Sequence, residues 1–169
     1  MIWFVYLVVA AAGIVLHLWQ DKAPRTPFRV VEVVLLYLLV IFVGIGGLMG
    51  ALGHVFYGRE IALQIGWPPG SPFQFEVAMA NLAFGVLGVL CVWQRGNFWT
   101  ATGIGQAVFL LGCAYGHGKD MLAGNLAPYN AGPGIWLYDV AVPLAILGLL
   151  WARRRLTRPA APSASGRFV

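Results

Sequence analysis

The sequence predicts an all-α protein, a polytopic bundle of five transmembrane helices that form a single domain over residues 1–155. Two observations favour this fold class. Apolar residues make up 60% of the 169 residues and charged residues only 10%, whereas a water-soluble domain carries about a quarter charged residues. The apolar residues also gather into five long stretches, each close to the roughly 20 residues that a helix needs to cross a hydrocarbon core.

The five predicted spans are separated by polar or helix-breaking segments. They cover residues 2–19, 33–57, 76–93, 98–117 and 135–152. The first connection, QDKAPRTPFR, is polar and holds two prolines, which interrupt a helix, and the third is the short QRGN. The second and fourth are longer and rich in Gly and Pro, yet too short for a soluble domain. The last residues, 156–169, are rich in Pro, Ala and Ser and predict a disordered cytoplasmic tail.

The distribution of Lys and Arg predicts the orientation of the bundle. Nine of these residues fall on one side of the predicted membrane: Lys22, Arg25, Arg29, Arg95, Arg153, Arg154, Arg155, Arg158 and Arg167. Only Arg59 and Lys119 fall on the other side. The positive-inside rule therefore predicts an outside N-terminus and a cytoplasmic C-terminus. Because the basic residues flank spans, the net charge of +5 indicates topology and lipid contact, and we expect no nucleic-acid partner.

Tryptophans fall near both predicted membrane interfaces, where amphipathic rings anchor a protein. They are Trp3, Trp67 and Trp136 on the outer side, and Trp19, Trp93, Trp99 and Trp151 on the inner side. This distribution agrees with the predicted spans.

Two histidines close similar segments, GALGH ending in His54 and CAYGH ending in His117. A shift of 63 residues superposes them and also superposes Glu76 on Asp139. Self-similarity at one offset is typical of internal repeats. We interpret the second and third spans, and the fourth and fifth, as a parallel repeat related by an axis along the membrane normal. The alternative is coincidence among few histidines.

The repeat places His54, His117, Glu76 and Asp139 at a similar depth near the outer interface. Two imidazoles and two carboxylates suit a Zn, Fe or Mn ion, and the same groups can relay protons. Further polar side chains are expected to line this site: Asn81, Cys113, Asp120, Asn125 and Asn130. A third hypothesis is a b-type haem between the two histidines, admitted by the glycines of their helices. Small residues also let helices pack closely.

A simpler interpretation needs no ligand. Carboxylates in the first turn of a helix and imidazoles in the last turn both complement its macrodipole. On this interpretation the four residues form structural ion pairs, and the protein is an accessory or structural subunit that docks to a larger membrane complex through its Gly-rich faces. The expected partners are the lipid bilayer and either another membrane protein or further copies of this chain. The sequence contains no nucleotide-binding loop, nucleophile elbow or Cys metal pair. We therefore expect a non-enzymatic membrane protein whose outward-facing site binds a metal ion or relays protons.

The run GHVFYGREIALQIGWPPGSPFQFEVAMANLAFGVLG, followed by FLLGCAYGHGKD and NLAPYNAGPG, resembles a family of small bacterial multi-pass membrane proteins of uncharacterised function. The resemblance covers roughly residues 40–150. It implies a location in the bacterial inner membrane and no established activity, and it assigns no catalytic residue.

Overall fold

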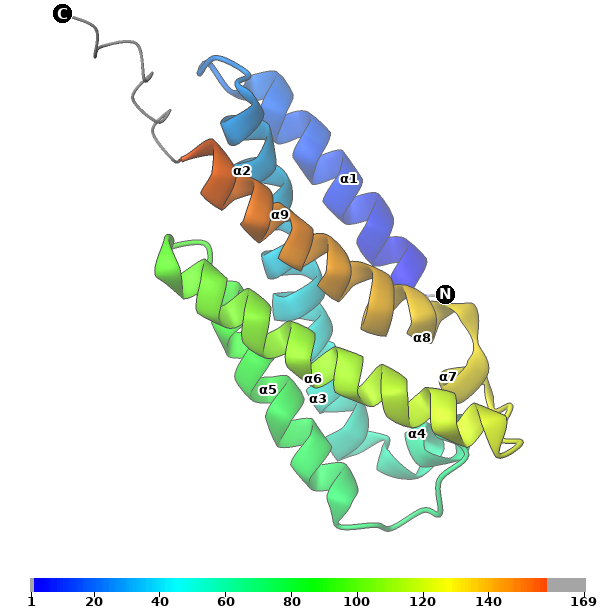
Figure 1. The fold of residues 1–169 in the computed structure, drawn as a ribbon. Helices are drawn as coiled ribbons and strands as arrows, with labels where there is room; N and C mark the ends of the chain where they lie inside the picture. The colour runs from blue at the N-terminus through cyan, green and yellow to red at the C-terminus, as the bar shows by residue number, and fades with distance from the viewer. Residues whose placement is uncertain (1, 158–169) are drawn as a thin grey trace, which may run out of the picture.

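The computed structural model describes residues 2–157, and every regular element in that range is helical. Five long helical segments account for most of it (Figure 1). They are α1 (Ile2–Gln20); α2 (Pro27–Tyr37) continued by η1 (Leu38–Ile45) and α3 (Gly46–Phe56); α5 (Phe73–Leu90); α6 (Asn97–Leu122); and α8 (Pro133–Trp136) continued by η2 (Leu137–Ala141) and α9 (Val142–Leu156). Two short helices, α4 (Gly58–Ile65) and α7 (Pro128–Ala131), lie in the longer connections. The predicted all-α class is confirmed.

Within residues 2–157, four helices are long and apolar enough to cross a membrane. They are Ile2–Gln20, Pro27–Phe56, Phe73–Leu90 and Pro128–Leu156. The remaining long helix, α6, has 26 residues but is diluted by Gly, Thr and Gln. It still presents apolar side chains outward, and Val108 is 70% exposed. Large exposed apolar surfaces mark contact with lipid or protein, so the helices are compatible with a membrane protein.

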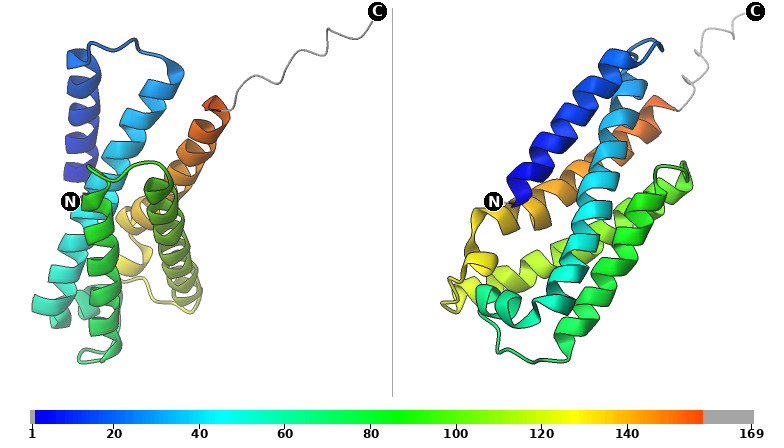
Figure 2. Two further views of the ribbon diagram at one scale, coloured as in Figure 1. Left: turned by 90° about the vertical axis from the view of Figure 1, so that its left-hand side faces the viewer. Right: turned by 180° about the vertical axis from the view of Figure 1, so that it is seen from behind.

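The long helices run between two ends of the molecule (Figures 1 and 2). At one end lie the α1–α2 connection, the α5–α6 connection and the C-terminal end of α9. We call this the basic end, because it carries Lys22, Arg25, Arg29, Arg95, Arg153, Arg154 and Arg155. Arg158 and Arg167 lie outside the described residues. The opposite end holds α4 and α7 together with the start of α5 and the end of α6, and we call it the loop end.

Two helix boundaries differ from the prediction, one because of a helix cap and one because the helix continues further along the chain. The second helix begins at Pro27, because the Thr26 hydroxyl accepts a hydrogen bond from the Arg29 backbone N–H at 3.2 Å and proline suits the first turn. Helix α6 continues past His117 to Leu122. His117 therefore lies within the helix and not at its end. The predicted tail 156–169 lies outside the described residues from position 158 onward.

The second and third long helices pack backbone against backbone. A Cβ atom on Gly88 of α5 would collide with the Gly44 backbone of η1, and one on Gly47 of α3 would come within 2.8 Å of the Asn81 carbonyl oxygen. Small residues allow this close approach between helices. Helix α5 therefore occupies this part of the glycine-rich surface, which the haem hypothesis had assigned to a porphyrin.

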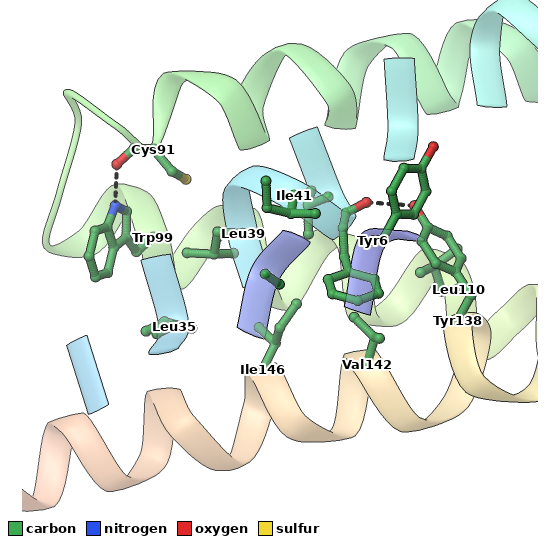
Figure 3. Close-up of a cluster of buried hydrophobic side chains, with 13 residues drawn as sticks. Tyr6, Leu35, Leu39, Ile41, Cys91, Trp99, Leu110, Tyr138, Val142 and Ile146 are labelled. Atoms are coloured by element: carbon green, nitrogen blue, oxygen red, sulfur yellow. Dashed lines mark hydrogen bonds between the residues drawn. The ribbon is translucent and has the colours of Figure 1, made fainter. Parts of the chain in front are cut away.

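Two π-helical segments meet in the core. The Tyr138 hydroxyl of η2 donates a hydrogen bond to the Phe42 carbonyl oxygen of η1 at 2.6 Å (Figure 3). The Gly46 N–H bonds to the carbonyls of Ile41 and Val43 and bypasses Phe42, so the tyrosine gives that carbonyl a donor. A Cβ atom on Gly46 would lie 2.5 Å from the same hydroxyl. The contact therefore needs glycine at this position.

The prediction that Trp99 is an interfacial anchor is wrong, because this residue is fully buried. Its indole N–H donates to the Cys91 carbonyl oxygen at 2.8 Å (Figure 3). The guanidinium carbons of Arg95 and Arg153 lie 5.3 Å and 5.6 Å from its ring, within the range of cation–π attraction. Trp99 thus joins the α5–α6 connection to α9.

The predicted repeat of helix pairs stays a prediction. The π-helical segment η1 covers residues 38–45, and a shift of 63 residues carries it to 101–108, inside the regular helix α6. Likewise, η2 at 137–141 corresponds to 74–78 in the regular helix α5. The two helix pairs therefore differ in backbone geometry at matching positions.

Candidate functional site

The structure brings together two of the four predicted site residues. His117 lies near the C-terminal end of α6, and Asp139 lies in η2. The His117 Nε2 atom is 3.7 Å from Asp139 Oδ2, and the two side chains are only 13% and 8% exposed. An imidazole and a carboxyl group are thus held as a largely buried pair at the loop end.

Asn130 fixes the imidazole of His117. This fully buried residue donates from Nδ2 to the carbonyl oxygens of Asn125 at 2.7 Å and His117 at 3.4 Å, which orients its amide. Its Oδ1 then faces His117 Nδ1 at 2.8 Å. Because an amide oxygen only accepts hydrogen bonds, His117 Nδ1 must donate. The nitrogen that gains or loses a proton is therefore Nε2, which faces Asp139.

Asn125 connects this site to the neighbouring loop. Its Nδ2 donates to the Ile65 carbonyl oxygen at the end of α4 at 2.9 Å, and its Oδ1 accepts from the Ala127 N–H at 3.1 Å. Gly66 ends α4 with a positive φ of 86° and lies against the Asn125 amide. The site is therefore held by Asn125 of the α6–α7 connection and by Asn130 of α7, both predicted as lining residues.

The other two predicted ligands lie outside this pair. His54 lies in the last turn of α3, and its Nδ1 is buried without a hydrogen-bond partner among the described residues. Glu76 lies in the first turn of α5 and is exposed. Across residues 2–157, no group of three or more His, Cys, Asp or Glu side chains is placed to hold a metal ion. The structure therefore does not gather the predicted four-residue metal site.

The remaining predicted lining residues divide between the two helix pairs. Cys113 and Asp120 flank His117 on α6, about one turn before and after it. Asn81 lies on α5 and donates from Nδ2 to the Val77 carbonyl oxygen of its own helix at 2.9 Å. It packs beside Gly50 of α3. Asn81 therefore supports the glycine-rich contact and is separate from the His117–Asp139 pair.

Sequence reasoning missed several buried polar groups. Gln106 of α6 is 1% exposed, and neither atom of its amide has a hydrogen-bond partner among the described residues. At the basic end, Arg153 bonds to Glu32 Oε1 through Nε at 3.0 Å and through a terminal nitrogen at 2.9 Å. The sequence did offer a signal for Gln106, because it is a glutamine within an otherwise apolar span. Nothing in the sequence pairs Glu32 with Arg153, which lies in another helix.

Helices of this length and apolarity, with exposed apolar side chains and a buried His–Asp pair, define an all-α protein compatible with a membrane environment. Residues 1–159 match the family described as "Family of unknown function (DUF6790)", and the chain belongs to this family. This match confirms that the chain resembles a family of uncharacterised function. No curated protein and no solved structure gives a significant match to the chain.

Proposed function

We propose that this chain is an integral membrane protein whose His117–Asp139 pair takes up and releases a proton at the loop end of the bundle. The observation that carries the proposal is the distance of 3.7 Å between His117 Nε2 and Asp139 Oδ2, with the other imidazole nitrogen committed to Asn130. Histidine is the side chain whose ordinary pKa lies closest to neutral pH. An imidazole and a carboxyl group that face each other in this way can share one proton, which then lies on either group.

The donor set supports a proton more than a metal ion. Zinc sites in proteins use at least three side-chain ligands, whereas this pair supplies one nitrogen and one carboxylate. The Nδ1 atom of His117 donates to Asn130 and cannot bind a metal at the same time. A proton needs only the Nε2 lone pair and the facing carboxylate. The pair can change its net charge by one without any further ligand.

The location in an apolar helix supports a functional role for Asp139. It lies within Pro128–Leu156, one of the four helices that are long and apolar enough to cross a membrane. An ionisable residue in such a helix costs about 2.5–3.5 kcal/mol at the membrane centre, and these residues usually face a partner or mark an ion pathway. Asp139 faces His117 as that partner.

We further propose five spans in a bacterial inner membrane, with the N-terminus outside and the C-terminus in the cytoplasm. Helix α6 supplies the fifth span in this proposal, because its 26 residues extend about 39 Å. The basic end then faces the cytoplasm, in agreement with the positive-inside rule. The His117–Asp139 pair is on the outer side.

Reporter fusions at the two termini test this topology. Five spans put the termini on opposite sides of the membrane, whereas four spans, with α6 outside the lipid, put them on the same side. We expect an enzyme that is active only outside the cytoplasm to work at the N-terminus and to fail at the C-terminus. Activity at both termini would exclude an odd number of spans.

Infrared difference spectroscopy of the purified protein tests the proton site. Between two pH values, we expect a change in one protonated-carboxyl band together with bands of the His117 ring. Asp139→Asn should remove the carboxyl change, and His117→Asn should shift the pH at which it occurs. The matched control is Glu76→Gln, the exposed acid at the corresponding position of the other helix pair, which should leave the Asp139 band unchanged. An unchanged spectrum in Asp139→Asn would refute the proposal.

A further inference from the structure

A cavity opens between α1 and α2 at the basic end, opposite to the His117–Asp139 pair at the loop end (Figure 1). Its volume is about 490 Å³, within the range of about 300–1,000 Å³ that small-molecule sites occupy. The lining residues come from the C-terminal part of α1, from the residue that follows it and from the end of α2: Gly13, Leu16, His17, Gln20, Asp21 and Tyr37.

The cavity extends from the edge of the apolar span into its interior. Helix α1 is long and apolar enough to cross a membrane, so its last residue, Gln20, lies at the boundary of the hydrocarbon. Gly13 lies seven residues earlier, about 10 Å deeper along the helix axis. The headgroup layer of one leaflet is only about 5–8 Å thick. A ligand that fills the cavity therefore has a polar part beside Asp21 and an apolar part beside Leu16 and Gly13.

Arg29 fixes the polar groups of the cavity. Its Nε donates to Asp21 Oδ2 at 2.6 Å, and one of its terminal nitrogens lies 3.3 Å from His17 Nε2. Because a guanidinium only donates hydrogen bonds, His17 Nε2 must accept, and the neutral imidazole carries its proton on Nδ1. This Nδ1–H forms no hydrogen bond to another residue within 2–157. His17 thus lines the cavity with a donor that a ligand can use.

Asp21 lines the same cavity with an acceptor. Its Oδ1 accepts from the Ala23 backbone N–H at 3.0 Å, and its Oδ2 accepts from Arg29. Each oxygen therefore has one hydrogen bond, whereas a carboxylate offers about four acceptor positions. The side chain is only 12% exposed. A primary ammonium group on a ligand would supply both the further donors and a positive charge.

The charges around the cavity match a ligand that carries both signs. Arg29 neutralises Asp21, and His17 is neutral in its contact with Arg29. Two exposed cations flank the cavity in the chain: Lys22 follows Asp21 directly, and Arg25 is hydrogen-bonded to the end of α1. These cations and the His17 N–H attract a phosphate, while Asp21 attracts an ammonium group. An anionic phospholipid without an amine would leave its headgroup beside the carboxylate with no compensating charge.

We propose that this cavity binds a phospholipid with an amine headgroup, of the phosphatidylethanolamine type. The ammonium group binds Asp21, the phosphate accepts from His17 Nδ1 and pairs with the flanking cations, and the glycerol and first acyl carbons lie along Leu16 and Gly13. Pockets between membrane helices that carry basic side chains recognise headgroups in this way. The inference rests on the membrane location in the proposed function and is independent of its proton site.

Native mass spectrometry of purified protein, stripped of lipid in detergent, tests the proposal by counting bound lipid at each lipid concentration. The probes are phosphatidylethanolamine and phosphatidylglycerol with the same acyl chains, glycerophosphoethanolamine and inorganic phosphate. We expect one phosphatidylethanolamine per chain, bound about tenfold more tightly than phosphatidylglycerol, because only the amine forms a charge-assisted hydrogen bond with Asp21. The two water-soluble probes should not displace it. Asp21→Asn should abolish the preference between the two lipids, whereas Glu60→Gln, an exposed acid of α4, should preserve it.

A second pair of variants tests the apolar part of the cavity and leaves the Asp21–Arg29 ion pair intact. Leu16→Trp narrows the cavity and should weaken the binding of both lipids about tenfold, as expected when a ligand loses most of its buried apolar area. Val15→Trp is the matched control, because Val15 is 65% exposed and does not line the cavity. This pair decides the question if Asp21→Asn does not fold.

Equal affinity of the wild type for the two lipids, or an unchanged preference in folded Asp21→Asn, would overturn the proposal. Displacement of the lipid by inorganic phosphate would indicate a site for free phosphate and would also overturn it, as would wild-type binding in Leu16→Trp. These outcomes are distinct from a failure of the proposed function, since the reporter fusions test the membrane location and the infrared band of Asp139 tests the proton site.

Discussion

The two histidines that follow the same Ala-x-Gly pattern have different surroundings. His117 has an amide partner on one ring nitrogen and a carboxylate facing the other. His54 has a buried Nδ1 without a partner among the described residues. The acids differ in the same way, because Asp139 is buried and Glu76 is exposed. Similar sequence patterns thus produced one connected site and one isolated histidine.

The difference originates in the connection that follows each helix. Asn130, which orients His117, lies in the short helix α7 of the segment that follows α6. At the corresponding position, 63 residues earlier, the chain has Trp67, whose indole offers a donor and no acceptor. The segments that follow the helices, more than the helices themselves, therefore determine which histidine ring has its proton fixed on one nitrogen. The helix contacts differ too, since the first pair packs through glycines and the second through side chains.

The largest effect is expected at the glycine contact. Gly88→Ala should destabilise the protein by about 1–3 kcal/mol, because the added Cβ collides with the Gly44 backbone, which cannot move aside as a side chain would. Gly112→Ala is the matched control. A Cβ there meets no atom within 4 Å, and alanine favours a helix over glycine. Unfolding in detergent measures both, and equal tolerance would mean that the Gly88–Gly44 contact does not limit stability.

The next effect sharpens the contrast between the histidines. Asn130→Ala should lower the free energy of unfolding by about 2 kcal/mol, since it leaves buried hydrogen-bonding groups unpaired. It should also release the proton of His117 from Nδ1, as seen in the nitrogen-15 chemical shifts of the ring. Asn81→Ala, which removes one bond within a helix, should cost less and leave those shifts unchanged. A His117 ring that keeps its tautomer without Asn130 would contradict our interpretation.

A smaller effect is expected where the two helix pairs meet. Tyr138→Phe removes the only described donor to the Phe42 carbonyl oxygen outside the helix ladder and should cost about 1 kcal/mol. Tyr115→Phe serves as the control, because Tyr115 is 72% exposed. Thermal unfolding of the two variants compares them directly. Equal midpoints would show that the junction of the π-helical segments contributes nothing to stability.

The smallest effect concerns acid pH at the basic end. Hydrogen bonds from the Ala23 backbone N–H and from the Arg29 side chain lower the pKa of Asp21 below its ordinary value of 3.8. Because the pKa is lower in the folded state, the stabilisation is complete above that value and is lost as the pH falls through the folded pKa. The difference in thermal midpoint between the wild type and Asp21→Asn should therefore shrink from pH 7 to pH 3.

Hydropathy was sufficient to predict the long helices, because apolar length is a property of each segment alone. It could not predict that α6 continues to Leu122, since Gly118, Lys119 and Asp120 interrupt the apolar pattern after His117. Asn125 and Asn130 were predicted as lining residues, but the groups to which they form hydrogen bonds depend on how the chain folds at α7. Trp99 was assigned to the interface because its sequence position does not reveal the Cys91 carbonyl that accepts from it. Side-chain partners across helices require the three-dimensional register.

That register is shifted within the second long helix. A π-helical segment such as η1 is equivalent in chain length to one inserted residue that the helix absorbs without breaking. One residue corresponds to a rotation of about 100° around the axis, so the buried face of α2 does not continue in phase into α3. An apolar pattern fitted to Pro27–Tyr37 would therefore assign the wrong inward residues in Gly46–Phe56. Deleting one residue within Leu38–Ile45 would bring the two halves back into a single helical phase and turn His54 away from its present neighbours.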